Sequence, residues 1–440
     1  MLKDTFCSSP WIHVRINPGG YYLPCRWFGP PHLVTTTHHI RDMSIADYVN
    51  SEDMCNLRTE MLNGGAPEIC QSCRYQDSNN KVSGRLKQLA VSSINIQQFD
   101  KTFCSSPHYK MFAESFADNG RTTAMPVDLQ IDLGNTCNSG CIMCGPTYSS
   151  KLAVEYVKLH KLEPILFAKY PKYKNWTDDA VAVDKFVVDI ANIPNLKYIH
   201  LLGGETLYLK SFYTMCNKLV EAGLAKNIDM GTTTNCTIYT PELENIIKQF
   251  NHVYLGLSIE AVHPVNDYIR WPSSITNVMD NIEKFIQLRE ITGMHLTLRI
   301  APNIFSIYHI DTIFEFMIEN RITAESCNIL IEPSCLRMEL LPKELIDVVL
   351  QKINAVINKH KLIDTGEVVV NTRSDNLVEL SIKTLIFEYK QLLENYRIPE
   401  DIEEERYNLV KFIKAFETIR NNTILDYLPE YEEFLRQYGY

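Results

Sequence analysis

The stretch that decides the fold is Cys137-Asn-Ser-Gly-Cys141-Ile-Met-Cys144, in which three cysteines follow at spacings of four and three residues. It comes directly after Val127-Asp-Leu-Gln-Ile-Asp-Leu133, whose alternating apolar residues predict a strand. The thiols should therefore lie on a loop at the carboxyl end of a strand, where ligand sites gather in α/β folds. Three thiolates can hold three irons of a four-iron cluster and leave the fourth iron open, whereas a closed zinc site needs four ligands.

This Cys-x3-Cys-x2-Cys pattern after a first strand resembles the signature loop of radical SAM enzymes. The resemblance implies that Cys137, Cys141 and Cys144 hold a 4Fe-4S cluster and that S-adenosylmethionine (SAM) binds its open iron. Met143 stands where the family often has an aromatic residue. Short cysteine loops also occur in zinc modules and ferredoxins, so a zinc loop or scattered buried thiols are the alternatives for this motif.

Downstream of the cysteine loop, strand-like and helix-like runs alternate, which predicts an α/β fold with a parallel sheet and right-handed crossovers. The expected strands cover residues 127–133, 196–202, 228–230, 253–259, 295–300 and 327–331. The expected helices cover residues 149–162, 181–193, 209–222, 240–250, 275–291 and 310–320. The resemblance implies that this sheet is the partial (βα)6 barrel of a radical SAM core, spanning residues 121–335.

Polar and glycine-rich segments follow the expected strands at their carboxyl ends, where barrel enzymes build their sites. Gly203, Gly204 and Glu205 follow the second strand. Glycines let a ligand approach the backbone closely, and a carboxylate can accept hydrogen bonds from an ammonium group. In this position the three residues resemble the family motif that holds the methionine amino group of SAM.

The third and fourth strands are followed by further cofactor candidates. Thr234 lies in a segment where the family often has Thr-Asn-Gly, although this chain has Cys236 in place of the glycine. Ser258 resembles the serine of a family Ser-x-Asp segment, which implies a contact to the carboxylate or ribose of SAM. Glu260 replaces the aspartate and serves either the substrate or a helix N-terminus. Arg270 belongs to an Ile-Arg pair and either anchors a carboxylate or forms a surface ion pair.

The first 120 residues contain a second set of cysteines. Trp11-Ile-His-Val-Arg-Ile16, a turn at residues 17–20 and Tyr21-Tyr-Leu-Pro-Cys25 predict a β-hairpin, which would bring Cys7 and Cys25 to one end. Cys70-Gln-Ser-Cys73 adds a Cys-x2-Cys pair. The four thiols suit zinc or an iron–sulfur cluster.

Cys7, Gly20 and Cys25 also resemble the opening of the auxiliary-cluster modules called SPASM and twitch domains. These modules normally follow the radical SAM core, whereas residues 1–120 precede it. The resemblance implies that Cys7, Cys25, Cys70 and Cys73 hold an auxiliary 4Fe-4S cluster; structural zinc and unliganded thiols are the alternatives. Because the hexapeptide at residues 5–10 recurs at residues 102–107, Cys104 is a reserve ligand.

Residues 336–440 carry no metal or nucleotide motif. Helical periodicity is expected over residues 341–360, 376–396 and 401–421, and a short helix begins near residue 427. We expect these helices to pack on the flank of the barrel and on the N-terminal module. A lid or a partner-binding surface is the alternative.

Composition narrows the class of protein. The chain has 440 residues, 45% hydrophobic content and a formal net charge of −10, with no long basic run, so no nucleic-acid partner is expected. No window reaches the ~18 continuous apolar residues of a membrane span. The 13 cysteines are odd in number and follow no secretory segment, which favours a cytoplasmic protein that uses cysteine for metal.

The resemblance also implies the chemistry. Radical SAM enzymes take an electron from a donor such as flavodoxin or ferredoxin, cleave SAM, and use the 5′-deoxyadenosyl radical to abstract a hydrogen atom. A peptide or protein is the first choice of substrate, and dehydrogenation or epimerisation of a small molecule or sugar is the second. Cys327 or Cys335 could return a hydrogen atom, although packing is the simpler role for each. A non-catalytic iron–sulfur or zinc scaffold is a third reading.

Overall fold

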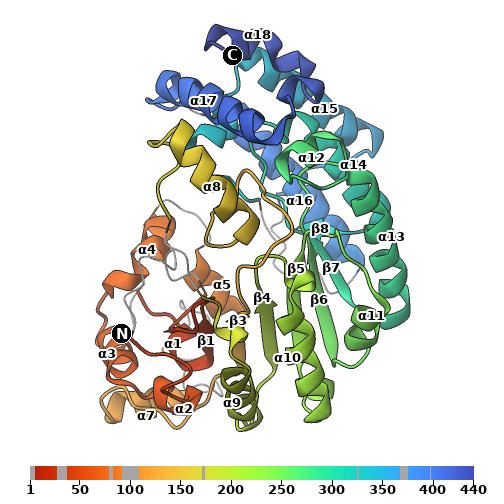
Figure 1. Ribbon diagram of the computed structural model, residues 1–440. Helices are drawn as coiled ribbons and strands as arrows, with labels where there is room; N and C mark the ends of the chain where they lie inside the picture. The colour runs from red at the N-terminus through yellow and green to blue at the C-terminus, as the bar shows by residue number, and fades with distance from the viewer. Residues whose placement is uncertain are drawn as a thin grey trace.

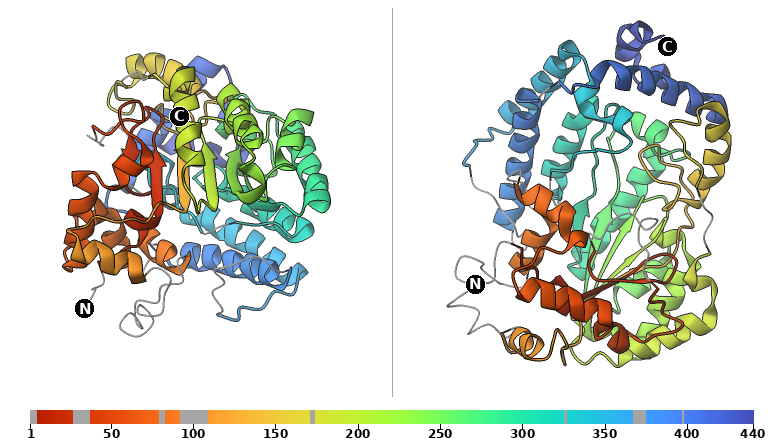
Figure 2. Two further views of the ribbon diagram at one scale, coloured as in Figure 1. Left: turned by 90° about the horizontal axis from the view of Figure 1, so that it is seen from below. Right: turned by 90° about the vertical axis from the view of Figure 1, so that its left-hand side faces the viewer.

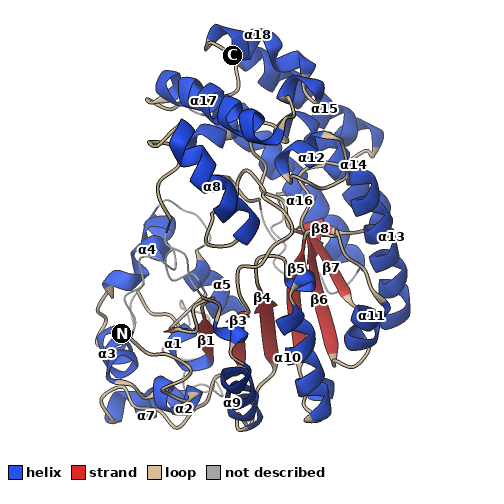
Figure 3. Ribbon diagram, in the orientation of Figure 1, coloured by secondary structure: helices blue, strands red, loops and turns tan. Residues whose placement is uncertain are grey.

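The computed structural model describes residues 5–26, 37–78, 83–91, 109–170, 174–324, 327–366, 375–396 and 398–440. Its strands form one eight-stranded sheet in the order β2-β1-β3-β4-β5-β6-β7-β8, drawn in red in Figure 3. The core strands are β3 (Asp128–Asp132), β4 (Tyr198–Leu202), β5 (Asp229–Thr234), β6 (His252–Leu257), β7 (His295–Leu298) and β8 (Thr323–Ala324). Each pairs with the next in parallel, as the sequence predicts.

Helices connect the core strands, because parallel neighbours need a crossover. In chain order these are α8 (Ser150–Leu162), α9 (Ala180–Ala191), α10 (Lys210–Glu221), α11 (Pro241–Ile247), α12 (Val265–Ile269), α13 (Ile275–Thr292) and α14 (Ile310–Asn320). Figure 1 shows α10, α11, α13 and α14 along the outer side of the sheet. The mixed α/β fold with a parallel sheet is therefore confirmed.

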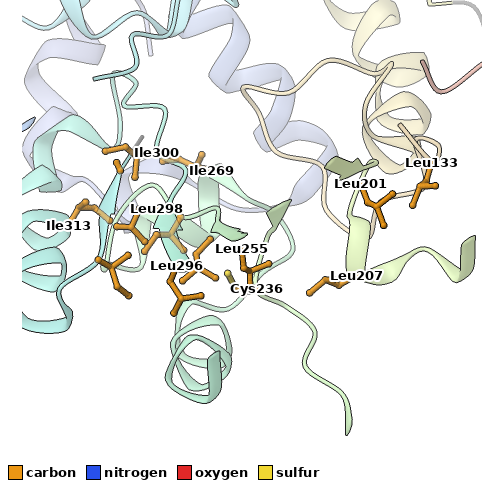
Figure 4. Packing of buried hydrophobic residues seen from close by; sticks show 14 of the residues in the cluster. Leu133, Leu201, Leu207, Cys236, Leu255, Ile269, Leu296, Leu298, Ile300 and Ile313 are labelled. Atoms are coloured by element: carbon orange, nitrogen blue, oxygen red, sulfur yellow. The ribbon is translucent and has the colours of Figure 1, made fainter. Parts of the chain in front are cut away.

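Side chains alternate across the sheet and give it two different faces. On β3, Leu129 and Ile131 are fully buried in the apolar core, whereas Gln130 and Asp132 occupy the opposite face. Figure 4 shows Leu201 of β4, Leu255 of β6 and Leu298 of β7, which belong to one cluster of buried apolar side chains. The helices pack on the apolar face of the sheet, and the polar side chains of the other face are available to form a site.

The N-terminal hairpin joins this sheet. Strand β1 (His13–Ile16) pairs antiparallel with β2 (Tyr22–Leu23) and in parallel with β3, the first core strand. The expected strand at residues 11–16 is shorter than predicted, because Pro10 starts a helical turn, α1 (Ser9–Ile12). The hairpin is thus an extension of the core sheet.

Short helices pack beside the hairpin and form the lower left of Figure 1. They are α2 (Ile45–Val49), α3 (Glu52–Leu62), α4 (Gln71–Ser78), α5 (Gly84–Val91) and α7 (Tyr109–Ala117). Arg58 of α3 is fully buried and donates to the carbonyl oxygens of Pro10, at 3.0 Å, and Gly120, at 2.6 Å. This guanidinium ties the beginning and the end of the N-terminal region together.

The sixth strand lies earlier than expected, so the prediction of a strand at residues 327–331 is wrong. Strand β8 follows α14 almost at once, and residues 327–331 form no regular element. Asn328 of this segment makes other hydrogen bonds: its backbone carbonyl accepts from the Tyr389 hydroxyl at 3.0 Å, and its side-chain Nδ2 donates to the Ile300 carbonyl at 2.9 Å.

The C-terminal region is helical, as the sequence predicts. Its helices are α15 (Lys343–Lys359), α16 (Asp375–Glu394), α17 (Ile402–Arg420) and α18 (Glu432–Gln437). Helix α15 packs on α14, and α17 packs on α8. In the right-hand view of Figure 2 the C-terminal helices, in blue, run along the left side and across the top of the molecule. Among the described residues, no helix combines the length and apolarity that crossing a membrane requires.

Candidate functional site

The loop of Cys137, Cys141 and Cys144 is held in shape by its neighbours. Backbone N–H groups of Gly140 and Ile142 donate to the carbonyl oxygens of residues 271 and 269, at 2.7 and 2.9 Å. On the other side, the Ser149 hydroxyl donates to the Ser139 carbonyl at 2.6 Å and caps α8 by accepting from the Leu152 amide. The protein therefore fixes the path of the loop through its own hydrogen bonds.

The three thiols of this loop lie near one another in a buried setting. Burial, with Cys141 as a charged neighbour, raises the pKa of Cys137 to about 12. Burial also raises the pKa of Cys144, and both other thiols add to the effect. Since metals bind the thiolate, a bound cation would have to supply the missing stabilisation of the charge.

The positions of Cys137, Cys141 and Cys144 distinguish a site for a single metal ion from a site for an iron–sulfur cluster. Among the residues that the structure describes, no three Cys, His, Asp or Glu side chains come to the spacing of ligands on a single metal ion. Thiolates that bind separate irons of a cluster need not converge on one point. Three neighbouring thiols on one preformed loop fit such a cluster.

The Gly203-Gly204-Glu205 segment packs directly against the cysteine loop. The Gly204 amide donates to the Gly134 carbonyl at 2.9 Å, and the Glu205 amide donates to the Thr136 carbonyl at 3.1 Å. A Cβ atom on residue 204 would come within 2.5 Å of the Asn135 carbonyl oxygen. Glycine at 204 thus permits the contact between the two loops, a role that sequence reasoning assigned to ligand approach.

The Glu205 side chain connects this segment to the end of β5. Its carboxylate is 2% exposed and accepts from the Leu207 amide at 3.1 Å, the Thr234 hydroxyl at 2.7 Å and the Asn235 amide at 2.6 Å. Burial raises the carboxyl pKa, and the hydrogen bonds oppose that rise. Three of about four acceptor positions on the carboxylate are therefore used by the protein itself.

Asn235 is a site residue that sequence reasoning did not select. Its side-chain amide donates to the side-chain oxygen Oδ1 of Asn138 at 2.9 Å and to the Ser139 hydroxyl at 3.0 Å. The next residue, Cys236, has a φ of +61°, so a non-glycine residue adopts the left-handed conformation that glycine favours. The Thr-Asn pair after a strand was the available signal for Asn235.

Arg270 and Glu260 form a buried ion pair instead of a surface one. The Arg270 Nη2 atom lies 2.5 Å from Glu260 Oε1, and the two side chains are 12% and 0% exposed. Arg270 Nη1 also donates to the Cys141 sulfur at 3.7 Å. The second oxygen of Glu260 accepts from the Ala301 amide at 2.8 Å. The pair therefore links the cysteine loop to the segment after β7.

One cavity of about 360 Å³ joins these groups. The predicted site residues that line it are Cys137, Cys141, Cys144, Gly203, Gly204, Glu205, Thr234, Ser258 and Arg270. The structure thus brings these nine candidates to one cavity, whereas Glu260 is not among the residues that line it. Cys327 and Cys335 are outside the set of described residues that line this cavity.

The N-terminal region contributes a wall that the sequence did not reveal. Arg15 of β1 lines the cavity together with Pro18, Asp132 and Tyr148. Arg15 Nη2 lies 2.7 Å from Asp132 Oδ2, and both side chains are under 10% exposed. Pairing of β1 with β3 produces this contact, and no local sequence pattern reports that pairing.

The four N-terminal cysteines gather in one neighbourhood. Burial raises the pKa of Cys7, and Cys25, Cys70 and Cys73 each add to the rise. Cys70 ends a short 3-10 turn before α4, and burial together with Cys25 and Cys73 raises its pKa to about 12. The arrangement fits a second thiolate-bound group. Cys104 and the repeated hexapeptide at residues 102–107 lie outside the described residues.

Comparisons with known families agree with this arrangement. The family model described as the Radical SAM superfamily matches residues 131–299, and the model described as an iron–sulfur cluster-binding domain, SPASM, matches residues 7–74. No curated protein sequence matches the chain.

Two of the solved structures that the chain matches are distant in sequence and in structure. SuiB of Streptococcus suis bound to precursor peptide SuiA shares 13% identity at a TM-score of 0.38, over 67% of this chain and 60% of that chain. The native anSMEcpe with bound AdoMet shares 14% identity at a TM-score of 0.37, over 54% of this chain and 62% of that chain. The chain thus matches about three fifths of the length of these proteins.

The two family matches cover the two cysteine sets, and each family type binds 4Fe-4S clusters, with SAM at the radical SAM core. The chain thus contains a radical SAM region at residues 131–299 and a SPASM iron–sulfur region at residues 7–74, on the N-terminal side of it.

Proposed function

We propose that this protein cleaves SAM reductively and abstracts a hydrogen atom from a substrate bound beside it. The observation that carries the proposal is the single cavity shared by the three cysteines and the SAM-binding candidates. Cys137, Cys141 and Cys144 would hold the cluster, which when bound supplies the electron that cleaves SAM to methionine and a 5′-deoxyadenosyl radical. The protein's part is to bind, to orient and to exclude water.

The residues of the chain divide this work between them. The backbone of residues 203–205, with Thr234 and Ser258, would bind SAM. Glu205 and Asn235 hold the loops that carry these groups at fixed positions through buried hydrogen bonds. Arg15 and Asp132 form a charged wall of the same cavity, where they can contact a polar substrate.

For the N-terminal region, we propose that Cys7, Cys25, Cys70 and Cys73 hold an auxiliary 4Fe-4S cluster. Their mutual proximity and the SPASM match over residues 7–74 support this assignment. Zinc is the competing metal, because a four-thiolate set also suits it. A flavodoxin or ferredoxin type of protein would supply electrons to the core cluster.

The first choice of substrate is a peptide or protein. The SPASM match fits this choice, because SPASM-bearing enzymes include peptide modifiers, as well as enzymes that oxidise small alcohols and sugars. Dehydrogenation or epimerisation of a small molecule or sugar is the second choice, since the cavity has a charged wall that could bind a polar small molecule.

The test of the reaction is anaerobic reconstitution followed by a SAM cleavage assay with dithionite. The wild type should form 5′-deoxyadenosine, and the triple variant C137A/C141A/C144A should form none. Iron and sulfide counts near eight per chain would support two clusters, whereas four irons plus one zinc would make the N-terminal site a zinc site. Absence of 5′-deoxyadenosine from the reconstituted wild type would favour the scaffold reading.

The substrate class can be tested without knowing the substrate. The enzyme is incubated with SAM and a deuterium-labelled cell extract that has been separated by size into peptides or proteins and small molecules. Deuterium in 5′-deoxyadenosine reports hydrogen abstraction from whichever fraction holds the substrate. Transfer from the large fraction supports a peptide or protein, and transfer from the small fraction alone contradicts it.

A further inference from the structure

The environment of the Cys141 sulfur contains a charged pair whose role is not explained by SAM binding alone. Arg270 Nη1 donates to this sulfur at 3.7 Å, while Nη2 of the same guanidinium binds Glu260 at 2.5 Å. The third nitrogen of the guanidinium, Nε, is buried without a hydrogen-bond partner among the described residues. The guanidinium is thus held between a cluster-ligand sulfur and a buried carboxylate.

The pair is built into the protein and is not an incidental surface contact. Glu260 is fully buried and is fixed by the Ala301 amide through its side chain and by the Asn266 side chain through its own amide. Arg270 ends α12, and its neighbours in the chain, Ile269 and Trp271, accept hydrogen bonds from the cysteine loop. The charge is therefore positioned by the same backbone that supports the loop.

We propose that the Arg270–Glu260 pair sets the reduction potential of the cluster held by Cys137, Cys141 and Cys144. This inference rests on the proposed function, because it requires those cysteines to hold the cluster. Reduction adds one negative charge to a cluster, and its potential depends on hydrogen bonds to the sulfurs and on nearby charge. Arg270 stabilises the reduced form, and Glu260 moderates that effect by neutralising part of the charge.

The two members of the pair should act in opposite directions. Removing the Arg270 charge takes away a hydrogen bond and a positive charge, so the reduced cluster becomes less stable and the potential becomes more negative. Removing the Glu260 charge leaves Arg270 uncompensated, so the potential becomes more positive. A purely structural role would disturb the loop in both cases and would give no reason for opposite signs.

The experiment is a redox titration of the reconstituted full-length enzyme, followed by electron paramagnetic resonance without SAM. The signal that changes when SAM is added to a separate sample identifies the cluster to be titrated. Arg270→Gln is expected to move its midpoint to more negative potential, and Glu260→Gln to more positive potential. The double variant should lie between the two, and Arg270→Lys, which keeps the charge, should lie nearer the wild type than Arg270→Gln.

Arg15→Gln and Asp132→Asn are the matched controls, because they break a buried pair that lines the same cavity and has no hydrogen bond to a cysteine in the described structure. They should shift the midpoint less than the Arg270 and Glu260 variants. Midpoints that move in the same direction in R270Q and E260Q, or that do not move, would overturn the inference. A change of SAM affinity in R270Q and E260Q without any change of the midpoint potential would also overturn the inference. A wild type without a cluster at the three cysteines would overturn the proposed function as well, which separates the two failures.

Discussion

Glu205 shows at the scale of a single residue how a site can depend on one side chain. Its buried carboxylate accepts hydrogen bonds from residues 207, 234 and 235, so it joins the loop after β4 to the end of β5. Sequence reasoning identified the residue and its place at the site. The three protein donors could not be predicted, because they depend on how two loops from different strands meet.

Replacing Glu205 with alanine should therefore harm both stability and SAM binding. The change leaves two backbone amides and a hydroxyl group buried without an acceptor, which costs about 3 kcal/mol of unfolding free energy. Urea unfolding and equilibrium dialysis of SAM would measure the two effects. Thr234→Ser, which keeps the hydroxyl, is the control and should resemble the wild type. Unchanged stability of E205A would contradict the assigned hydrogen bonds.

Asp267 of α12 provides a pH-dependent prediction at the same scale. Burial raises the pKa of this carboxyl to about 6, and its Oδ1 atom has no hydrogen-bond partner among the described residues. A folded-state pKa above the unfolded value of about 4 means that the proton stabilises the folded state at low pH, and that this stabilisation is lost as the pH rises through 6.

The Asp267→Asn variant should accordingly become more stable than the wild type as the pH rises. The side chain is partly exposed, so we expect a difference of only about 1 kcal/mol at pH 8 and a much smaller difference at pH 4.5. Chemical unfolding of both proteins across this range would measure it. A difference that stays constant with pH would show that Asp267 does not titrate abnormally.

Among the helices, α17 and α8 support the cysteine loop through contacts of Arg420, a clamp formed by Arg420, Glu155 and the Gly140 carbonyl. Arg420, at the end of α17, is 7% exposed and donates to the Gly140 carbonyl and to both oxygens of Glu155 on α8, with the shorter contact at 2.5 Å. Sequence periodicity placed both helices but gave no sign of this contact, because the two residues lie 265 positions apart.

Breaking this clamp should loosen the loop. Arg420→Met leaves Glu155 without its partner and the Gly140 carbonyl without its donor, and removal of one member of a buried ion pair costs about 3 kcal/mol. We expect the reconstituted variant to release iron to a chelator faster than the wild type. A double-mutant cycle with Glu155→Gln separates the pair from other effects. Equal rates of iron release in R420M and wild type would contradict the clamp.

The strands show where sequence patterns work and where they fail. Alternating apolar residues located β3, β4, β6 and β7, whereas β5 (Asp229–Thr234) extends four residues beyond the expected 228–230, where its residues Gly-Thr-Thr-Thr show no apolar alternation. The apolar residues at 327–331 led to the wrong prediction of a strand. These residues are not consistently buried, since Ile331 is 68% exposed. Strand β8 has only two residues, which is too short for any period to be visible.

At the scale of the whole molecule, the N-terminal region is part of the barrel sheet. Strand β1 is fully buried and pairs with β3 over four residues, so residues 13–16 extend a sheet whose core strands, β3 to β8, begin more than 100 positions later. The sequence predicts a cysteine-rich auxiliary-cluster module over residues 1–120. Local patterns could not show the long-range pairing that makes this module a wall of the cavity.

A fragment beginning at residue 121 should consequently fail to form a stable core. The fragment lacks β1, so the edge of β3 is exposed and Asp132 loses its ion pair with Arg15. An open sheet edge favours aggregation. Size-exclusion chromatography and thermal unfolding of the fragment would test this. A monomeric, cooperatively unfolding fragment would show that the core is independent of the hairpin.

The central claim is that one cavity holds both a cluster on Cys137, Cys141 and Cys144 and SAM on the segments after β4, β5 and β6. The most direct measurement is the electron paramagnetic resonance spectrum of the reduced, reconstituted enzyme with and without SAM. We expect SAM to change the line shape of the cluster signal in the wild type, and we expect C137A/C141A/C144A to lack this signal. A SAM-sensitive signal that survives in the triple variant, or a wild-type cluster signal that SAM leaves unchanged, would contradict it.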